Sequence, residues 1–320
     1  MERGARNFLL IILFIILLGN STLAQSVNPI PFIVFWNLEN YFDPFDDKSK
    51  DDDEFTPSGT KHWTWKRFLR KRNDIAKVII SFKEFFGDFP PIVGFAEVEN
   101  RYVLEELLQN TPLVKLDYKL IHFEGEDKRG IDCAMIYREG YFKPFSCNSL
   151  AVELPDSSTT RDILQVKGTL WEDTLEIFVA HFPSKLGGAQ VSDRKRERAM
   201  KRLYDAIVEG KSSNVVVMGD FNDTPDSEVF YGLPDFMELM GQNGVIREGS
   251  IKYKGVWELI DNFIISNPYS NRWRFGVYTL DYLLEEDLNY LGRRPRRCFI
   301  GPMYNGGVSD HLPVYISRVL

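Results

Sequence analysis

Short apolar runs alternate with longer segments of helical periodicity in the first third of the chain. The runs at residues 32–36 and 91–96 predict strands, and the periodic segments at 68–86 and 102–108 predict helices. Asn100 stands directly before the second periodic segment, in the position of a helix N-cap. This alternation is typical of βαβ units.

The middle of the chain changes to successive strands with little room for helices between them. These strands are predicted at residues 118–123, 132–137, 142–152, 163–170 and 175–180. A further helix at 192–209 leads into a buried strand at 214–218, and a last pair of strands at 259–266 and 312–317 closes the chain. The pattern predicts an α/β fold, a four-layer sandwich of two mixed, largely antiparallel sheets packed face to face with helices outside.

The first residues have the pattern of a secretion signal. Arg3 and Arg6 precede an apolar run at 8–18, and small residues follow up to Ala24. The run is much shorter than the ~20 residues that cross a bilayer. We therefore expect residues 1–24 to be a signal peptide and 25–320 to be one catalytic domain of a periplasmic or extracellular protein. An uncleaved membrane anchor is the alternative interpretation.

Composition limits the possible partners. The chain contains 44% hydrophobic residues, enough for a sizeable core, and its net charge of −7 argues against strong non-specific binding of nucleic acid. Three cysteines are too few for a disulfide scaffold, although an exported protein permits one bridge. Cys133 lies in an apolar run and is expected to be buried. We expect a monomer with no stable protein partner.

Polar residues end, or directly follow, several of the predicted strands. They occur in Phe35-Trp36-Asn37, Gly94-Phe95-Ala96-Glu97, Val179-Ala180-His181, Met218-Gly219-Asp220-Phe221-Asn222, Leu259-Ile260-Asp261 and Val308-Ser309-Asp310-His311. Strand ends are where α/β folds gather their sites. One such residue would be an ordinary strand terminus, but six segments of this kind predict a shared site.

Four segments carry a resemblance to a known family. Asn37-Leu38-Glu39-Asn40, Phe95-Ala96-Glu97-Val98-Glu99-Asn100, Gly219-Asp220-Phe221-Asn222-Asp223 and Ser309-Asp310-His311-Leu312-Pro313-Val314 resemble, in this order, the motifs of the endonuclease/exonuclease/phosphatase superfamily. That superfamily has the deoxyribonuclease I-like fold. The resemblance implies a metal-dependent hydrolase of phosphate esters.

The resemblance assigns roles that agree with the chemistry of phosphate esters. His311 would be the general base, Asp261 would hold its ring, and Asp220, Asn222 and His181 would complete the catalytic group. Glu97, Asn37 and Asp310 would bind a divalent cation. Oxygen ligands suit Mg²⁺ first, with Mn²⁺ or Ca²⁺ as alternatives, and no Cys/His spacing typical of zinc is present.

Four further residues are candidates for supporting roles. Arg129, Lys185 and Arg194 are candidates for contact with the substrate phosphate, and Asp132 is a candidate for orienting His181. A structural histidine or a solvated cation is the alternative for each residue of these types.

The substrate class stays open at the level of sequence. A phosphodiesterase or nuclease is the first interpretation, and a sphingomyelinase-like phospholipid hydrolase or an inositol or sugar phosphate hydrolase is the second. An inactive exported binding protein is the third, against which stands the presence of both motif histidines and all the expected carboxylates.

If the protein is exported, the sequence predicts where its signal peptide is cleaved. Because Thr22 and Ala24 occupy the small-residue positions before a cleavage site, the mature N-terminus should be Gln25. The intact mass of the exported protein measures this. A product that retains Met1 and sediments with membranes would instead support the anchor.

Overall fold

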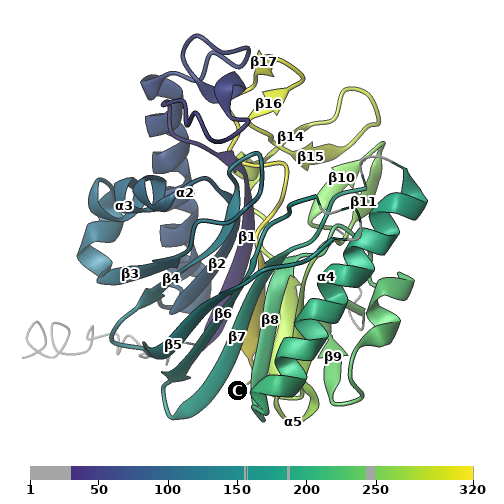
Figure 1. Cartoon of the computed structure of the whole chain (residues 1–320). Helices are drawn as coiled ribbons and strands as arrows, with labels where there is room; N and C mark the ends of the chain where they lie inside the picture. Colours follow the sequence, from purple (N-terminus) through teal and green to yellow (C-terminus); the bar gives the residue numbers. More distant parts are fainter. Residues whose placement is uncertain (1–29, 155, 157, 186–187, 243–248, 320) are drawn as a thin grey trace, which may run out of the picture.

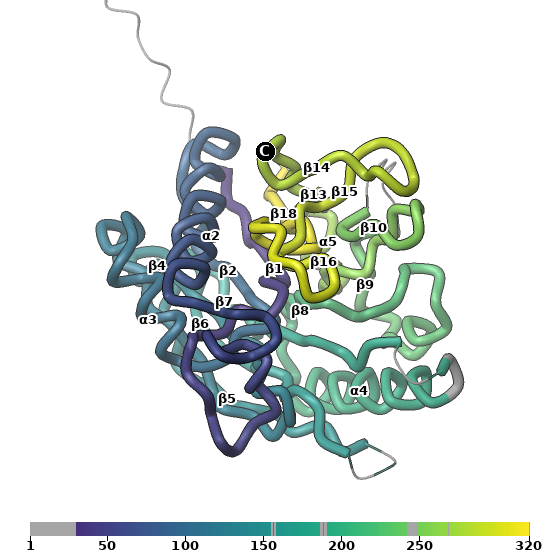
Figure 2. The backbone as a smooth tube through the Cα atoms, turned by 90° about the horizontal axis from the view of Figure 1, so that it is seen from above, coloured from purple at the N-terminus to yellow at the C-terminus, as the bar shows by residue number. Residues whose placement is uncertain are grey.

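Two β-sheets packed face to face form the centre of the molecule, and helices cover their outer faces (Figures 1 and 2). The computed structural model describes residues 30–154, 156, 158–185, 188–242 and 249–319. The predicted signal peptide lies outside these residues. In the described ranges, no helix has both the length and the hydropathy needed to cross a membrane.

The first sheet has the strand order β13-β18-β1-β2-β4-β3, in which β1 and β2 are parallel and the other neighbours are antiparallel. Its strands are β1 (Phe32–Tyr41), β2 (Ile92–Val98), β3 (Tyr118–His122), β4 (Asp132–Arg138), β13 (Trp273–Val277) and β18 (Val314–Arg318).

The second sheet has the order β5-β6-β7-β8-β12-β9, again with one parallel pair, β7 and β8. Its strands are β5 (Phe142–Leu150), β6 (Ile163–Leu170), β7 (Asp173–His181), β8 (Val215–Asp220), β9 (Met237–Leu239) and β12 (Asp261–Ser266). Three two-stranded ribbons complete the strands: β10 (Ile251–Tyr253) with β11 (Val256–Glu258), β14 (Leu284–Glu286) with β15 (Arg293–Pro295), and β16 (Phe299–Ile300) with β17 (Met303–Tyr304).

The helices lie on opposite sides of the two sheets. Helices α2 (Trp65–Phe86) and α3 (Arg101–Gln109) pack on the first sheet, and α4 (Ala189–Gly210) packs on the second (Figure 1). The short helix α5 (Asn267–Ser270) follows β12. The short 3₁₀ segments are η1 (Asp53–Phe55), η2 (Pro112–Leu116), η3 (Glu228–Gly232), η4 (Met240–Gln242) and η5 (Asp281–Leu283).

Three apolar layers hold the sandwich together. The central layer lies between the sheets and contains Phe35 of the first sheet and Met218 of the second, both fully buried. The two outer layers lie under α2 and α3 and under α4. The fold class expected from the sequence, two mixed sheets with helices outside, is therefore confirmed.

Several local expectations are also confirmed. The Asn100 side chain accepts a hydrogen bond of 3.0 Å from the backbone N–H of Val103, as an N-cap does. Cys133 is buried between the sheets, and Cys133, Cys147 and Cys298 are all free thiols.

One expectation about the last strands is wrong. Strand β12 pairs with β8 and β9, whereas β18 pairs with β1 and β13, so the two strands lie in different sheets and do not form a pair. The ribbons between residues 284 and 304 were not predicted, because strands of two or three residues carry no readable period.

Candidate active site

The alternation of side chains along the strands brings the predicted site residues together. On β7, Ile177 and Val179 point into the layer between the sheets, so His181 follows on the same face. The same two-residue step leads from Met218 to Asp220 on β8.

Two further strands deliver residues by the same step. On β1 the step leads from Phe35 to Asn37, and on β12 it leads from Phe263 to Asp261. Asn37 and Asp261 are each 1% exposed. The site is therefore the polar end of the central layer, where the strand ends of both sheets meet.

Glu97 reaches the site by a backbone irregularity. The pairing of β2 with both neighbours shifts register around this residue, and Glu97 has a φ of 60°. A bulge of this kind re-aims a side chain at the end of a strand. The Glu97 carboxylate accepts a hydrogen bond of 2.8 Å from the backbone N–H of Asn40, and its Oε1 lies 3.4 Å from the amide nitrogen of Asn37.

A tight turn after β8 holds Asp220 and Asn222. The backbone N–H of Asn222 donates to Asp220 Oδ1 at 2.9 Å, and Asn222 has a φ of 50°. The side chain of Asn222 donates to the backbone carbonyl of Phe182 at 2.9 Å. This bond ties the turn to the end of β7, directly after His181.

His311 and Asp261 form a buried pair. Nδ1 of His311 lies 2.7 Å from Asp261 Oδ2, while Nε2 of His311 lies 3.9 Å from Asp220 Oδ2 and 3.8 Å from Asp310 Oδ1. With Asp261 accepting the Nδ1 proton, the neutral ring presents Nε2 as a proton acceptor toward the other two carboxylates.

The segment that carries His311 is fixed by four hydrogen bonds. Ser309 Oγ donates to the carbonyl of Asn37 at 2.7 Å and accepts from the His311 N–H at 3.0 Å, and the indole N–H of Trp36 donates to the His311 carbonyl at 2.9 Å. The N–H of Leu312 donates to the carbonyl of Ser250 at 2.8 Å. The Ser250 hydroxyl also accepts from the Asp261 N–H at 3.2 Å. His311 and Asp261 are therefore held in part by the same residue, Ser250.

The surroundings set the protonation of the two histidines in opposite directions. Burial alone would lower the pKa of His311, but the carboxylates of Asp261, Asp220 and Asp310 outweigh burial and raise it well above 6.5. Burial, together with the charges of Arg161 and Arg129, lowers the pKa of His181. His181 is therefore neutral at pH 7.

Asp220 is also perturbed. Burial raises its pKa to about 7, and the neighbouring Asp261 carboxylate adds to this effect, while His311 and the hydrogen bonds from Asn222 and Asn37 oppose it. A buried carboxyl group whose pKa lies near 7 is a common feature of functional sites.

The donor set fits a hard divalent cation. Glu97 and Asp310 offer carboxylate oxygens beside the buried cluster, and their side chains keep 14% and 29% exposure, which leaves an approach from solvent. Asp220, Asp261 and His311 also lie within 4.8 Å of one another. In that trio, however, Asp261 and His311 are hydrogen-bonded to each other.

Asn37 lies in the cluster with its amide nitrogen toward the acids. Nδ2 donates to Asp220 Oδ2 at 2.9 Å, and Oδ1 accepts the backbone N–H of Glu39 at 2.9 Å. Its role as an oxygen ligand stays a prediction, since it requires the amide to turn.

Two residues, Arg297 and Glu39, extend the polar cluster beside the metal-binding candidates. Arg297 pairs with Asp310 Oδ2 at 2.5 Å, and its Nε lies 3.8 Å from Glu39 Oε1. Glu39 accepts the N–H of Cys298 at 2.7 Å, and burial, followed by the charge of Asp310, raises its pKa to about 8. Arg297 belongs to the arginine run 293–297, in which nothing in the sequence distinguishes it.

Arg161 is a buried residue of the site that the sequence analysis did not single out. It is 7% exposed, and its guanidinium donates to the Phe182 carbonyl at 2.8 Å and lies 3.5 Å from Asp127. Its Nε has no hydrogen-bond partner among the described residues. In the sequence, Arg161 is marked only as a polar residue just before the strand at 163–170.

The structure also places the remaining candidate residues. Lys185 binds Asp223 at 3.2 Å, and Arg129 contributes its charge to the surroundings of His181. Arg194 is exposed on α4. The expected pairing of Asp132 with His181 is wrong: Asp132 Oδ2 lies 3.3 Å from His122 Nε2, because β3 and β4 are neighbours and bring these two side chains together.

A family model agrees with this geometry over almost all of the described chain. The model described as "Endonuclease/Exonuclease/phosphatase family" matches residues 32–319. The chain belongs to the endonuclease/exonuclease/phosphatase family. A comparison with curated proteins gives no match.

Several solved structures share this fold. The Bacteroides thetaiotaomicron mannosyl-6-phosphatase Bt3783 is 15% identical with a TM-score of 0.59, over 91% of this chain and 100% of that one. A humanized Danio rerio TDP2 is 15% identical with a TM-score of 0.59, over 91% and 99%. The human nocturnin catalytic domain is 16% identical with a TM-score of 0.57, over 92% and 95%. At this identity the likeness concerns the fold.

The position of Glu97 generates a prediction about the metal. Glu97→Gln keeps the size of the side chain and its hydrogen bond from Asn40 but removes the charge, so the fold should persist while divalent-cation affinity falls by about tenfold or more. Isothermal titration calorimetry with Mg²⁺ and Mn²⁺ measures this change.

Glu139→Gln is the matched control, because Glu139 is an exposed carboxylate at the end of β4 whose partner, Lys119, is 3.7 Å away. Unchanged cation binding in Glu97→Gln, with the control also unchanged, would show that Glu97 is not a ligand.

Proposed function

We propose that this protein is an exported, divalent-metal-dependent hydrolase of phosphate esters that activates water with the His311–Asp261 pair. One observation carries the proposal: the pair is buried, joined at 2.7 Å, and directs Nε2 of His311 toward Asp220 and Asp310. Family membership supports phosphoester hydrolysis in general.

Hydrolysis of a phosphate ester requires an activated water and a way to neutralise charge on the phosphate. His311 Nε2 accepts the proton of the attacking water, and Asp261 keeps the Nδ1 proton in place and stabilises the imidazolium that forms. Glu97 and Asp310 would hold the cation. When bound, a divalent cation supplies charge neutralisation for the phosphate oxygens.

Arg161 and His181 provide the groups that face the phosphate. The Arg161 guanidinium brings a fixed positive charge to the base of the site, and its unpartnered Nε is a donor for an anionic oxygen. Neutral His181 can donate an N–H bond to a phosphate oxygen or to the leaving group. Asn222 donates a hydrogen bond to the Phe182 carbonyl, as Arg161 does, and completes this group.

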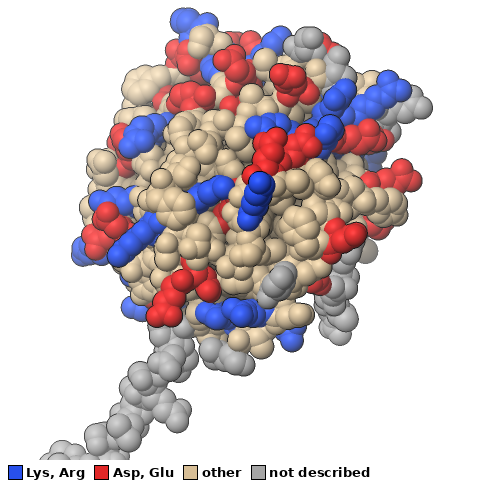
Figure 3. Space-filling view, turned by 60° about the horizontal axis from the view of Figure 1, so that its bottom comes forward, with Lys and Arg blue, Asp and Glu red and all other residues tan. Residues whose placement is uncertain are grey.

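The charge of the chain favours small or neutral substrates over a nucleic-acid duplex. The net charge is −7. Figure 3 shows the end of the molecule opposite the candidate site, where basic and acidic side chains are interspersed. Binding along a nucleic-acid backbone normally needs a continuous basic patch. The acidic net charge therefore favours a sugar phosphate or another small ester over a nucleic-acid duplex as the substrate.

The His311–Asp261 pair makes a kinetic prediction. His311→Ala and Asp261→Asn should each lower kcat by about 10²- to 10⁴-fold with little change in Tm, because one removes the base and the other removes its orienting group. The double variant should be scarcely slower than His311→Ala, since the carboxylate has no ring left to hold. Rates are measured on bis-p-nitrophenyl phosphate and p-nitrophenyl phosphate, with EDTA as the metal-free control.

Losses that multiply in the double variant would contradict joint action of the two residues. The mechanism would then have to be built around His181.

The raised pKa of His311 makes a second prediction. A base must be unprotonated to act. On the acidic side of the pH–rate profile, kcat should therefore rise with pH as His311 loses its proton. Asp261→Asn removes the carboxylate that most strongly raises the pKa of His311, so this acidic limb should move to lower pH while the plateau falls. A pH–rate profile of the two proteins measures this, and a limb that stays in place would assign it to another group.

A further inference from the structure

Two adjoining hollows form a groove that starts at the catalytic loops and runs along α4. The inner hollow has a volume of about 510 Å³ and lies between the start of α4 and the turn after β8. The outer hollow, of about 500 Å³, lies between α4 and the 3₁₀ segment η3. Both are lined in part by Glu197, Glu228 and Val229, so they adjoin each other.

The inner end of this groove lies beside two segments that carry candidate active-site residues. Asp223 follows Asn222 directly, and Lys185 belongs to the segment that leaves β7 after His181. The Phe182 carbonyl, which lies between these two segments, accepts hydrogen bonds from both Asn222 and Arg161. A substituent on a phosphate held at the site would have the inner hollow as its neighbour.

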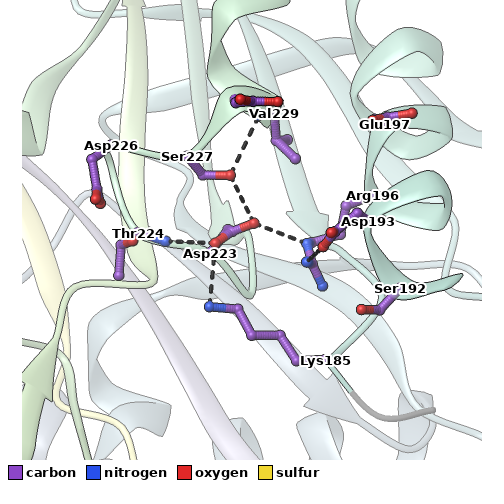
Figure 4. A pocket seen from close by; sticks show the side chains of 11 residues that line it. Lys185, Ser192, Asp193, Arg196, Glu197, Asp223, Thr224, Asp226, Ser227 and Val229 are labelled. Carbon is purple, nitrogen blue, oxygen red and sulfur yellow. Dashed lines mark hydrogen bonds and ion pairs between the residues drawn. The ribbon is translucent and has the colours of Figure 1, made fainter. Parts of the chain in front are cut away.

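The floor of the inner hollow is a pre-formed polar network centred on Asp223 (Figure 4). Asp223 Oδ2 accepts from Arg196 Nε at 3.1 Å and from the Ser227 hydroxyl at 2.8 Å, while Oδ1 lies 3.2 Å from Lys185 Nζ and accepts from the Thr224 N–H at 3.1 Å. Arg196 is 1% exposed. Groups fixed in this way lose little entropy when they bind hydroxyl groups.

The charge of the inner hollow is unfavourable for a polyanion. Five acidic and two basic side chains line it: Asp193, Glu197, Asp223, Asp226 and Glu228 against Lys185 and Arg196. Both basic groups are already paired with acids. A second phosphate or a nucleic-acid strand would be repelled, and a neutral ligand rich in hydroxyl groups would find acceptors and donors.

The outer hollow adds aromatic surface. Tyr204 on α4 is 37% exposed, and Tyr231 on η3 is 75% exposed. An aromatic ring packs well against the C–H face of a sugar ring, while its hydroxyl can bond to the sugar oxygens. Among the described residues that line the inner hollow, no side chain is aromatic, so the part nearest the phosphate lacks a stacking platform for a base.

We propose that this groove binds a neutral oligosaccharide whose phosphorylated sugar is presented to the His311 site. The proposal rests on the proposed function, and it names the substrate class as a phosphorylated glycan. The polar inner hollow would bind the sugar next to the phosphate, and the tyrosines of the outer hollow would bind the next sugars.

The test compares the protein with the double variant Tyr204→Ala/Tyr231→Ala on three phosphate esters. For phosphorylated oligosaccharides derived from yeast mannan, the variant should raise KM about tenfold, the effect of two lost aromatic contacts, with kcat unchanged. For p-nitrophenyl phosphate and a short single-stranded DNA, both constants should stay the same. Phe145→Ala is the control, because Phe145 is 64% exposed on β5 and lies outside the groove.

Direct binding separates this proposal from the proposed function. Unphosphorylated mannotriose should bind the protein, by calorimetry or ligand-observed NMR, and binding should weaken in the double variant even if no ester is hydrolysed. Hydrolysis of simple esters without mannotriose, maltotriose or cellotriose binding would overturn the groove proposal alone. A KM for DNA that responds to the tyrosines would also overturn it, because the groove would then serve nucleic acid.

Discussion

The hydrogen bond between His311 and Asp261 is the contact on which the site depends, because it crosses from one sheet to the other. His311 stands in the segment that leads into β18 of the first sheet, and Asp261 begins β12 of the second. A bond of 2.7 Å in a buried position leaves little room for the sheets to slide. The apolar layer between the sheets, with Phe35 and Met218 on its two sides, fixes their separation and so serves the chemistry.

This arrangement concentrates charge where burial is costly. Asp220, Asp261 and His181 are almost fully buried, and the cost appears as a pKa of about 7 for Asp220 and a lowered pKa for His181. Such a cluster does not serve stability. A bound cation would offset the repulsion between these acids.

Backbone strain is also gathered at the site. Glu39, Asn40, Glu97 and Asn222 are residues other than glycine with φ between 47° and 60°. Each of these conformations costs free energy, on the order of 1–3 kcal/mol, and persists when hydrogen bonds determine it. Glu97 is held by the N–H of Asn40, and Asn222 is held by Asp220 and Phe182. The strain turns side chains that simple alternation would send elsewhere.

The sequence by itself determined the fold class and singled out the main candidate site residues. Strand and helix periods repeat over many residues, and the two-residue step of a strand already implies that Asn37, His181, Asp220 and Asp261 follow buried positions. The order of short motifs added His311 and Glu97.

Only the tertiary structure decided which residues from distant segments meet. The partner of Asp132 is His122. Arg297 contacts Asp310 and Glu39, although nothing in the sequence distinguishes it from the other arginines of its run. Arg161 and the groove along α4 depend on how β6, β7 and α4 pack against one another. These features are set by side-chain packing between elements far apart in the chain, and a local pattern of hydrophobic and polar positions carries no information about that packing.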